Sequence, residues 1–300
     1  MYETLLVPLD GSEEAKVVLP YVQEIAAKFA SKVILIRVFE SEKSAEDSSY
    51  EDSSYMDGIT RQMLAQLSKQ GSFLTISSEI LFGKPAKAIL EYADKNECKL
   101  IVVSSHGLSG HDMWSIGSIA DKILRAENHP VLLIKDSPKR QLPATGGLIK
   151  KILVPLDGSR PGETIVPYAE TMALGFKAQL VLFNVIEQPI TTWKGPGYDL
   201  TAEVKSDFEK HASPIALAYL EQVAGKLQNK NLGVSMVVRI GYAADEILNF
   251  AGANDMDLIA MSTHGLSGIR KWVIGSVTDK ILRAGDKPVL LVPATKSGPV

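Results

Sequence analysis

Short apolar runs alternate with longer amphipathic segments along the whole chain. In the first half, β-rich runs predict strands over Thr4–Leu9, Lys32–Phe39, Phe73–Ile80, Leu100–Ser104 and Val131–Ile134. The segments between them, such as Glu13–Phe29 and Lys84–Asp94, space apolar residues three and four apart, as amphipathic helices do. The second half repeats this order and predicts strands over Lys151–Leu156, Gln179–Ile186, Leu232–Ile240, Leu258–Met261 and Val289–Val292.

Strands that alternate with helices predict an α/β fold. We expect two tandem doubly wound domains, each a five-stranded parallel sheet with helices on both faces. In such sheets ligands bind at the carboxyl ends of the strands, where the strand order reverses. Any small-molecule site is therefore expected where the carboxyl ends of the strands meet the starts of the helices.

The two halves repeat each other in sequence. The phrase SSHGLSGHDMWSIGSIADKILRAENHPVLLI, from Ser104 to Ile134, returns as STHGLSGIRKWVIGSVTDKILRAGDKPVLLV, from Ser262 to Val292. LLVPLDGS at the start of the chain returns as ILVPLDGS at Ile152. A tandem duplication follows, with domains at 1–137 and 150–295 and a linker at 138–149 that is rich in proline, glycine and charge.

The composition of the chain argues against several classes of partner. The chain has 300 residues, 45% hydrophobic and 22% charged, and a net charge of -3. It shows no long basic stretch and no apolar run of about 18 residues, so neither nucleic acid nor membrane is expected as a main partner. Cys98 is the single cysteine, and Met1–Val7 lacks the pattern of an export signal. We expect a cytoplasmic protein without disulfides.

An acidic repeat interrupts the pattern after the second strand. The segment Glu46–Tyr55 reads EDSSYEDSSY and holds almost no apolar residue. The favoured interpretation is a solvated or disordered excursion, and a phosphorylation or partner segment is the alternative.

A Gly-Ser step opens the short helix near the end of each half. Gly117-Ser118 and Gly275-Ser276 precede SIADKILRA and SVTDKILRA, where first-turn N–H groups lack partners within the helix and the dipole favours an anion. A second glycine, Gly107 or Gly265, is separated from each step by nine residues. The pattern predicts phosphate binding, and an ordinary serine N-cap is the alternative.

These motifs together resemble the universal stress protein family. Its nucleotide-binding members carry Gly-x2-Gly-x9-Gly-Ser/Thr after the fourth strand, and the later glycines match here in both halves. The first motif glycine is replaced by Ser104 and Ser262, a small-for-small change that narrows the room beside ribose and phosphates. The likeness also includes the VPLDGS opening and the final PVLL strands.

The resemblance implies ATP, or another adenine nucleotide, as the ligand in each half. The first-strand aspartates would accept hydrogen bonds from ribose, with an N-cap of the following helix as the alternative, and the valines ending the second strands would contact the base or pack in the core. The implied contacts of the first half are Pro8, Asp10, Val38, Val103, Ser104, His106, Gly107, Gly110, Gly117, Ser118 and Ile119. Those of the second half are Pro155, Asp157, Val185, Met261, Ser262, His264, Gly265, Gly268, Arg270, Gly275, Ser276, Val277 and Thr278.

The two copies differ in charge between the glycines. If the two loops superimpose, Asp112 of the first takes the place of Arg270 and Lys271 of the second. Thr278 adds a hydroxyl where the first copy has Ala120. Because cations hold phosphates and a carboxylate opposes them, the second site is predicted to bind triphosphate more tightly.

Neither a metal site nor a catalytic centre is indicated. His106 and His264 are equally compatible with ligand contact and loop packing, and no His/Cys set with zinc spacing accompanies them. Magnesium would arrive with ATP, held by phosphate oxygens and water. No P-loop or nucleophile elbow is found, and Cys98 is expected to pack in the core.

Three functions therefore stay open. The first is a nucleotide-responsive stress regulator, the second a protein that acts by assembly without nucleotide, and the third a slow ATPase. Val131–Ile134 and Val289–Val292 are apolar, follow Pro130 and Pro288 and suit sheet edges. In the resembling family such strands pair between protomers, so an intrachain pseudo-dimer is expected here, and a homodimer is open.

Overall fold

The computed structural model describes residues 1–41, 49–69, 74–107, 116–126, 129–135, 147–187, 202–227, 231–265 and 274–294, without the side chains of 49–53, 69 and 202–209. The strands of the first half are β1 (Thr4–Pro8), β2 (Lys32–Phe39), β3 (Ile76–Phe82), β4 (Leu100–Ser104) and β5 (Val131–Ile134). Those of the second half are β6 (Lys151–Pro155), β7 (Gln179–Ile186), β8 (Val234–Ile240), β9 (Leu258–Ser262) and β10 (Val289–Val292). Each half is a parallel sheet, which confirms the predicted fold class.

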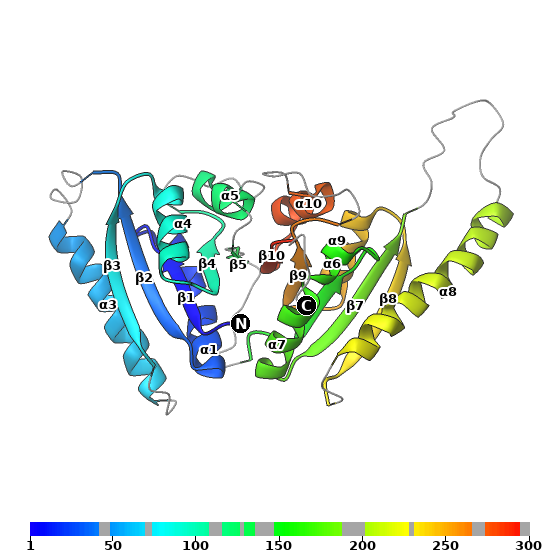
Figure 1. The fold of residues 1–300 in the computed structure, drawn as a ribbon, viewed down its shortest axis with the longest axis horizontal. Helices are drawn as coiled ribbons and strands as arrows, with labels where there is room; N and C mark the ends of the chain where they lie inside the picture. The colour runs from blue at the N-terminus through cyan, green and yellow to red at the C-terminus, as the bar shows by residue number, and fades with distance from the viewer. Residues whose placement is uncertain are drawn as a thin grey trace.

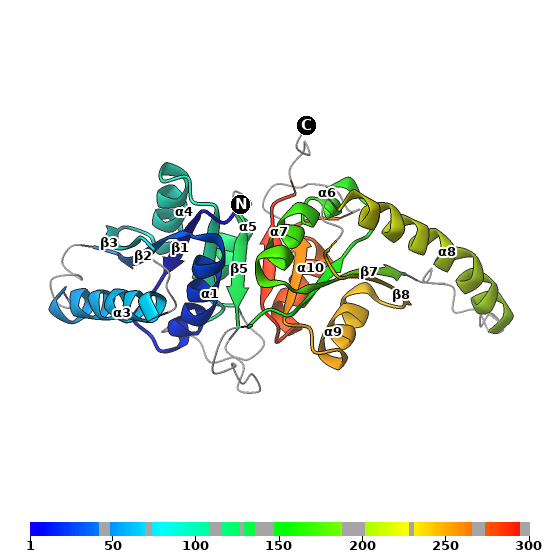
Figure 2. The ribbon, with the colours of Figure 1, turned by 90° about the horizontal axis from the view of Figure 1, so that it is seen from below.

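Helices connect these strands in the same order in both halves. The first half has a 3-10 turn at Glu14–Val18, then α1 (Leu19–Phe29), α3 (Ser49–Lys69), α4 (Pro85–Lys95) and α5 (Ser118–Arg125). The second half has α6 (Arg160–Glu163), α7 (Val166–Phe176), α8 (Ala202–Lys226), α9 (Ala243–Ala253) and α10 (Ser276–Ala284). Figure 2 shows α3 and α4 on opposite sides of the strands of the first half, and α7 and α9 on opposite sides in the second.

The ten strands form one continuous sheet. Their order is β3-β2-β1-β4-β5-β10-β9-β6-β7-β8, so the two five-stranded halves meet at their last strands (Figure 1). β5 and β10 pair antiparallel, with Leu132 opposite Leu290. All four residues of each of these strands are buried, because helices cover both faces at the junction.

Further contacts join the halves below the sheet junction. The hydroxyl of Tyr2 donates to the Tyr168 carbonyl at 2.8 Å, and the Phe29 ring lies 6.3 Å from that of Phe176. The carboxylate of Glu24 accepts from the N–H groups of Gly147 and Leu148 at 2.6 and 2.9 Å, which fixes the chain where it enters the second half. The two halves thus share one core cluster on each face of the sheet.

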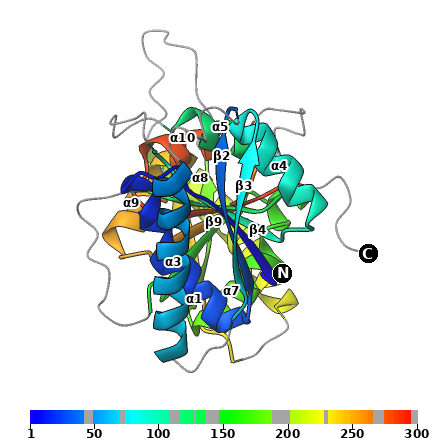
Figure 3. The same ribbon diagram turned by 90° about the vertical axis from the view of Figure 1, so that its left-hand side faces the viewer.

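Helix α3 corrects the interpretation of the acidic repeat. The chain is helical from Ser49, so the second EDSSY copy is the start of a long helix and not an irregular excursion, while 46–48 lie outside the described residues. Met56, Ile59, Met63 and Leu67 are spaced three and four apart and are all buried. Helix α3 packs against β2 and β3, beside which it lies in Figure 3, and this packing stabilises a helix that extends back through the polar repeat.

The third strand of the first half lies later than predicted. β3 ends at Phe82, two residues beyond the expected end, and its predicted first residue, Phe73, is outside the described part of the chain. The strand continues until Gly83, which turns the chain at φ +124° and donates its N–H to the Phe39 carbonyl at 2.8 Å. A glycine is suited to this backbone conformation because it has no Cβ.

Candidate functional site

Each half contains a cleft at the carboxyl ends of its central strands. The first cleft lies where β1 and β4 end and α5 begins, and the second lies where β6 and β9 end and α10 begins. β1 and β4 are neighbours in the sheet, as are β6 and β9, and the strand order reverses between them. The clefts therefore occupy the positions at which doubly wound sheets bind ligands.

Most residues predicted from the sequence line these clefts. In the first cleft they are Pro8, Asp10, Val38, Val103, Ser104, His106, Gly107, Gly117, Ser118 and Ile119. In the second they are Pro155, Asp157, Val185, Met261, Ser262, His264, Gly265, Gly275, Ser276, Val277 and Thr278. Gly110, Gly268 and Arg270 lie outside the described residues, as do Asp112 and Lys271, so the predicted charge difference between the loops is not part of the described structure.

The aspartate after the first strand of each half is fixed by its own turn. Asp157 Oδ1 accepts from the Ser159 N–H at 3.0 Å and from its hydroxyl at 2.6 Å. Ser159 Oγ in turn accepts from the Gly162 N–H at 3.0 Å and is the N-cap of α6. The corresponding contacts of Asp10 with Ser12 are 3.0 and 2.5 Å. The interpretation of Asp157 as a plain N-cap is therefore wrong, because the serine caps the helix and the aspartate orients the serine.

The loop glycines lie directly against these carboxylates. A Cβ built on Gly265 would overlap Asp157 Oδ2, and one on Gly107 would overlap Asp10 Oδ2. Neither glycine has a positive φ, so space and not backbone conformation demands a glycine here. The contact brings the first-strand carboxylate and the start of the motif loop together at the floor of each cleft.

The serines at the first motif glycine position have a structural contact of their own. The Ser104 hydroxyl donates to the His106 carbonyl at 2.6 Å, and the Ser262 hydroxyl donates to the His264 carbonyl. Each bond closes a tight turn directly after the fourth strand of its half. The serine therefore holds the beginning of the motif loop, a role that a glycine could not take.

Each histidine packs in its loop and also lines the cleft of its half. His264 is 3% exposed, and its Nδ1 lies 3.1 Å from Thr263 Oγ1. His106 is half-buried, with Nδ1 2.9 Å from Ser105 Oγ. The loop packing is thus observed, and the ligand contact stays a prediction.

The short helices begin with a glycine cap. Gly117 and Gly275 are the N-caps of α5 and α10, and their N–H groups donate to the carbonyls of Ser105 and Thr263 at 2.8 and 2.9 Å. A glycine N-cap has no side chain that could accept from the first-turn N–H groups. The alternative interpretation, an ordinary serine N-cap, is therefore wrong, because the serine that follows each glycine is the first helical residue.

The hydroxyl of Thr278 is used inside the fold. It donates to the Ser262 carbonyl at 3.3 Å, and the residue is 4% exposed. This bond joins α10 to the end of β9. The hydroxyl that Thr278 adds relative to Ala120 is therefore bonded within the fold, although the residue lines the second cleft.

The two clefts differ in size. The second has a volume of about 360 Å³ and the first about 120 Å³. At equivalent positions of the walls, the first cleft has Pro85 and Ile119 where the second has the smaller Ala243 and Val277. Other positions differ in the opposite direction, such as Ile36 in the first cleft and Phe183 in the second, so side-chain size alone does not explain the narrowing.

Sequence reasoning missed several lining residues. Phe183 and Ile36 line the clefts from β7 and β2, two positions before the predicted valines and on the same strand face. Strand alternation was therefore a signal that could have found them. Ala243, in the first turn of α9, and Glu187, after β7, come from segments with no motif, and only the fold brings them to the second cleft.

The surroundings of the clefts give no sign of a metal centre. Among the described residues, no group of three or more His, Cys, Asp or Glu side chains is placed to hold a metal ion. Cys98 is 4% exposed in the core, and burial raises the pKa of its thiol to about 11, which supports a packing role. Within the described ranges, every helix is too short or too polar to cross a membrane.

Comparison with known proteins gives a consistent result. The sequence model of the universal stress protein family matches residues 1–135 and 148–293. Universal stress protein Slr1230 of Synechocystis sp. is 23% identical over 318 residues, which cover 96% of this chain and 99% of that protein. Universal stress protein Sll1654 of the same organism is 31% identical over 163 residues, covering 52% of this chain and 96% of that protein.

A solved structure agrees in fold over the whole chain. The crystal structure of a universal stress protein from Archaeoglobus fulgidus has a TM-score of 0.71 at 18% identity, and the match covers 98% of this chain and 100% of that one. This likeness concerns the fold alone.

Proposed function

The chain belongs to the universal stress protein family, and we propose that it binds ATP or another adenine nucleotide, chiefly in the second cleft, as a nucleotide-responsive stress regulator. The proposal joins the family assignment to the chemistry of the two clefts. It makes binding, and not turnover, the primary activity.

The observation that carries the proposal is the second cleft itself. A helix N-terminus capped by Gly275, the fixed carboxylate of Asp157 and the apolar wall of Val185 face one space. These groups suit the phosphates, the ribose and the base in turn, because first-turn N–H groups donate to anions and a carboxylate accepts from ribose hydroxyls. The first cleft repeats the set with Gly117, Asp10 and Val38.

Cleft volume supports unequal sites. Ligand sites for molecules of drug size occupy about 300 to 1,000 Å³. The second cleft, at about 360 Å³, falls in this range, and the first, at about 120 Å³, falls below it. We therefore infer that the second site binds nucleotide more tightly, a conclusion that no longer depends on the charges of the motif loops.

Magnesium enters this proposal only with the nucleotide. The phosphate oxygens and water would supply most of its ligands, because the described residues offer no acidic cluster around either cleft. The protein would recognise the phosphates through neutral donors, namely the first-turn N–H groups and the hydroxyl of Ser276.

The test is calorimetric titration of ATP with magnesium into the intact, ligand-free chain and two matched variants. Gly275→Val with Ser276→Ala places a branched side chain at the second helix start, and Gly117→Val with Ser118→Ala does the same at the first. We expect micromolar binding that the second-half pair removes and the first-half pair leaves largely intact. Equal effects of the two pairs would contradict the inequality, and no binding to the folded wild type would contradict the proposal.

The same samples separate the other functions. Release of phosphate from ATP that stops in the Gly275→Val, Ser276→Ala variant would favour a slow ATPase. Absence of binding by ATP, ADP and AMP would favour assembly without nucleotide.

We also propose that the first half acts mainly as a scaffold. It pairs with the second through β5 and β10 as an intrachain pseudo-dimer. Its smaller cleft is consistent with that role. A homodimer of whole chains and a cytoplasmic location remain expectations from the sequence, and sedimentation of the purified chain tests the first of them.

A further inference from the structure

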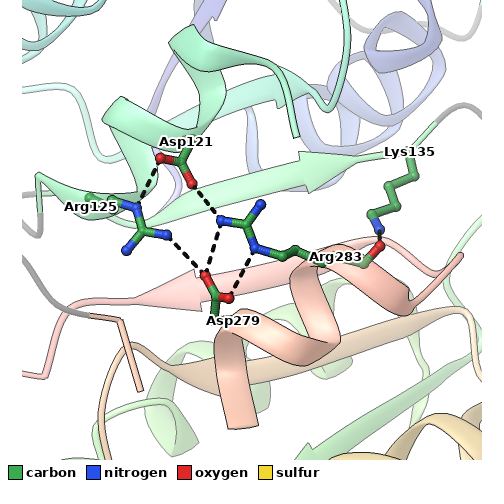
Figure 4. Close-up of polar contacts among 5 residues, drawn as sticks. All are labelled: Asp121, Arg125, Lys135, Asp279 and Arg283. Carbon is green, nitrogen blue, oxygen red and sulfur yellow. Dashed lines mark hydrogen bonds and ion pairs between the residues drawn. The ribbon is translucent and has the colours of Figure 1, made fainter. Parts of the chain in front are cut away.

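Four charged side chains close a ring across the junction of the halves. Arg125 of α5 contacts Asp121 at 2.9 Å on its own helix and Asp279 of α10 at 2.9 Å (Figure 4). Arg283 of α10 contacts Asp279 at 2.9 Å and Asp121 across the junction at 3.3 Å. Each aspartate thus contacts both arginines, and the ring holds two negative and two positive charges.

The ring lies close to both helix starts. Asp279 is in the first turn of α10, three residues after Ser276, and Asp121 is in the first turn of α5, three residues after Ser118. Three residues of helix rise span about 4.5 Å. A phosphate held at either helix start would therefore lie within one to two turns of a carboxylate.

A first-turn carboxylate has two opposite effects at such a site. It stabilises the helix through the dipole, but it repels an anion bound at the same end. Burial alone would raise the pKa of Asp279, but hydrogen bonds and the charges of Arg283 and Arg125 outweigh burial and lower it. The carboxylate is therefore charged at neutral pH, and anion binding depends on how well that charge is neutralised.

Neutralisation needs an arginine from the other half. Arg283 is shared between Asp279 and Asp121, so it does not balance both carboxylates by itself. Removal of Arg125 would change the charge of the ring from zero to -1. That uncompensated charge would lie between the two helix starts.

We propose that Arg125 of the first half is a positioning and charge-balancing residue for nucleotide bound in the second cleft, and that Arg283 does the same for the first. This inference rests on the proposed function. It gives the duplication a role in binding, because each half supplies an arginine that neutralises a carboxylate beside the other half's phosphate site.

Lys135 adds a second contact between the first half and α10. Its Nζ donates to the carbonyls of Arg283 and Gly285 at 3.0 and 2.5 Å, at the C-terminal end of α10. The equivalent residue after β10 is Pro293, which has no donor. The first half therefore contacts α10 at both ends, which agrees with a second site that depends on it more.

The experiment measures adenosine, AMP and ATP binding to the full chain by calorimetry. Arg125→Gln should lower ATP affinity roughly tenfold, lower AMP affinity less and leave adenosine affinity unchanged, because only the phosphates meet the added negative charge. The loss for ATP should shrink at high salt. Arg61→Gln, at an exposed position of α3, changes the net charge equally and should leave all three affinities unchanged.

A second variant separates charge balance from a purely structural role. Arg125→Gln with Asp279→Asn returns the ring to zero net charge and should restore ATP binding to within about threefold of the wild type. Equal losses for adenosine and ATP, or no recovery in the double variant, would overturn the inference and leave the ring as a bond between the halves. A wild type that binds no ATP would instead overturn the proposed function, and this is seen before any variant is compared.

Discussion

Gly265→Ala is expected to damage the fold of the second half at one defined point. The added Cβ would overlap Asp157 Oδ2. The carboxylate cannot withdraw freely, because its other oxygen accepts from the N–H and the hydroxyl of Ser159 at 3.0 and 2.6 Å. Either the loop shifts, or these two hydrogen bonds are lost.

The two routes set the magnitude. Overpacking a filled site costs about 1 to 3 kcal/mol. Loss of a hydrogen bond to a charged group costs about 1.5 to 3 kcal/mol. The protein will adopt whichever change costs less free energy, so we expect Gly265→Ala to lower the free energy of unfolding by about 2 kcal/mol. Nucleotide binding should also weaken, because either Asp157 or the loop has moved.

Urea denaturation of the wild type and four variants provides the assay. Asp157→Ala removes the obstacle, so the Gly265→Ala, Asp157→Ala double variant should be no less stable than Asp157→Ala alone. Gly252→Ala, in α9 with no atom within 4 Å of the new Cβ, is the matched control and should gain up to about 1 kcal/mol. A Gly265→Ala variant as stable as the wild type, or a loss that persists in the double variant, would refute the steric argument.

Three further predictions follow from buried or strained groups. Burial lowers the pKa of Lys135 from 10.5 to about 8, so between these pH values the unfolded chain binds more protons than the folded chain. The stability of the wild type relative to Lys135→Met, measured in urea melts, should therefore rise as the pH increases from about 8 to 10.5. Cys98, with its thiol pKa raised to about 11 by burial, should react with a disulfide reagent at pH 8 only at the rate of unfolding, and fast reaction of the native chain would contradict its burial. Lys177 ends α7 at φ +54°, so Lys177→Gly should raise the free energy of unfolding by about 1 kcal/mol in chemical denaturation.

The short apolar runs of the sequence were sufficient to predict most strands of both halves. β2, β4, β5, β7 and β10 begin and end where expected, and most of their ends coincide with charged, proline or serine positions. β3 and α3 were less predictable. Ile80 and Phe82 are exposed on the edge strand, so no burial pattern marked its end, and the polar start of α3 is held by a stripe of buried residues that begins only at Met56.

The site was predictable where glycines and an aspartate follow strands, since those positions must meet at the switch point of any doubly wound sheet. It was not predictable where tertiary contacts assign a side chain its partner. Thr278 illustrates this limit, because its hydroxyl reaches the Ser262 carbonyl and not the open cleft. Sequence position alone cannot distinguish these two directions.

The duplication also explains where the halves stayed alike. DKILRA occurs in both α5 and α10, and its aspartate and arginine form the cross-junction ring. A pseudo-twofold contact is self-complementary, so a charge changed in one helix leaves an unpaired charge in the other. The cleft walls carry no such mutual constraint, and there Ile36 is matched by Phe183 and Pro85 by Ala243. One half can therefore change its ligand space while the junction stays symmetric, and under our proposal this allows the first half to lose nucleotide affinity and still supply Arg125 to the second.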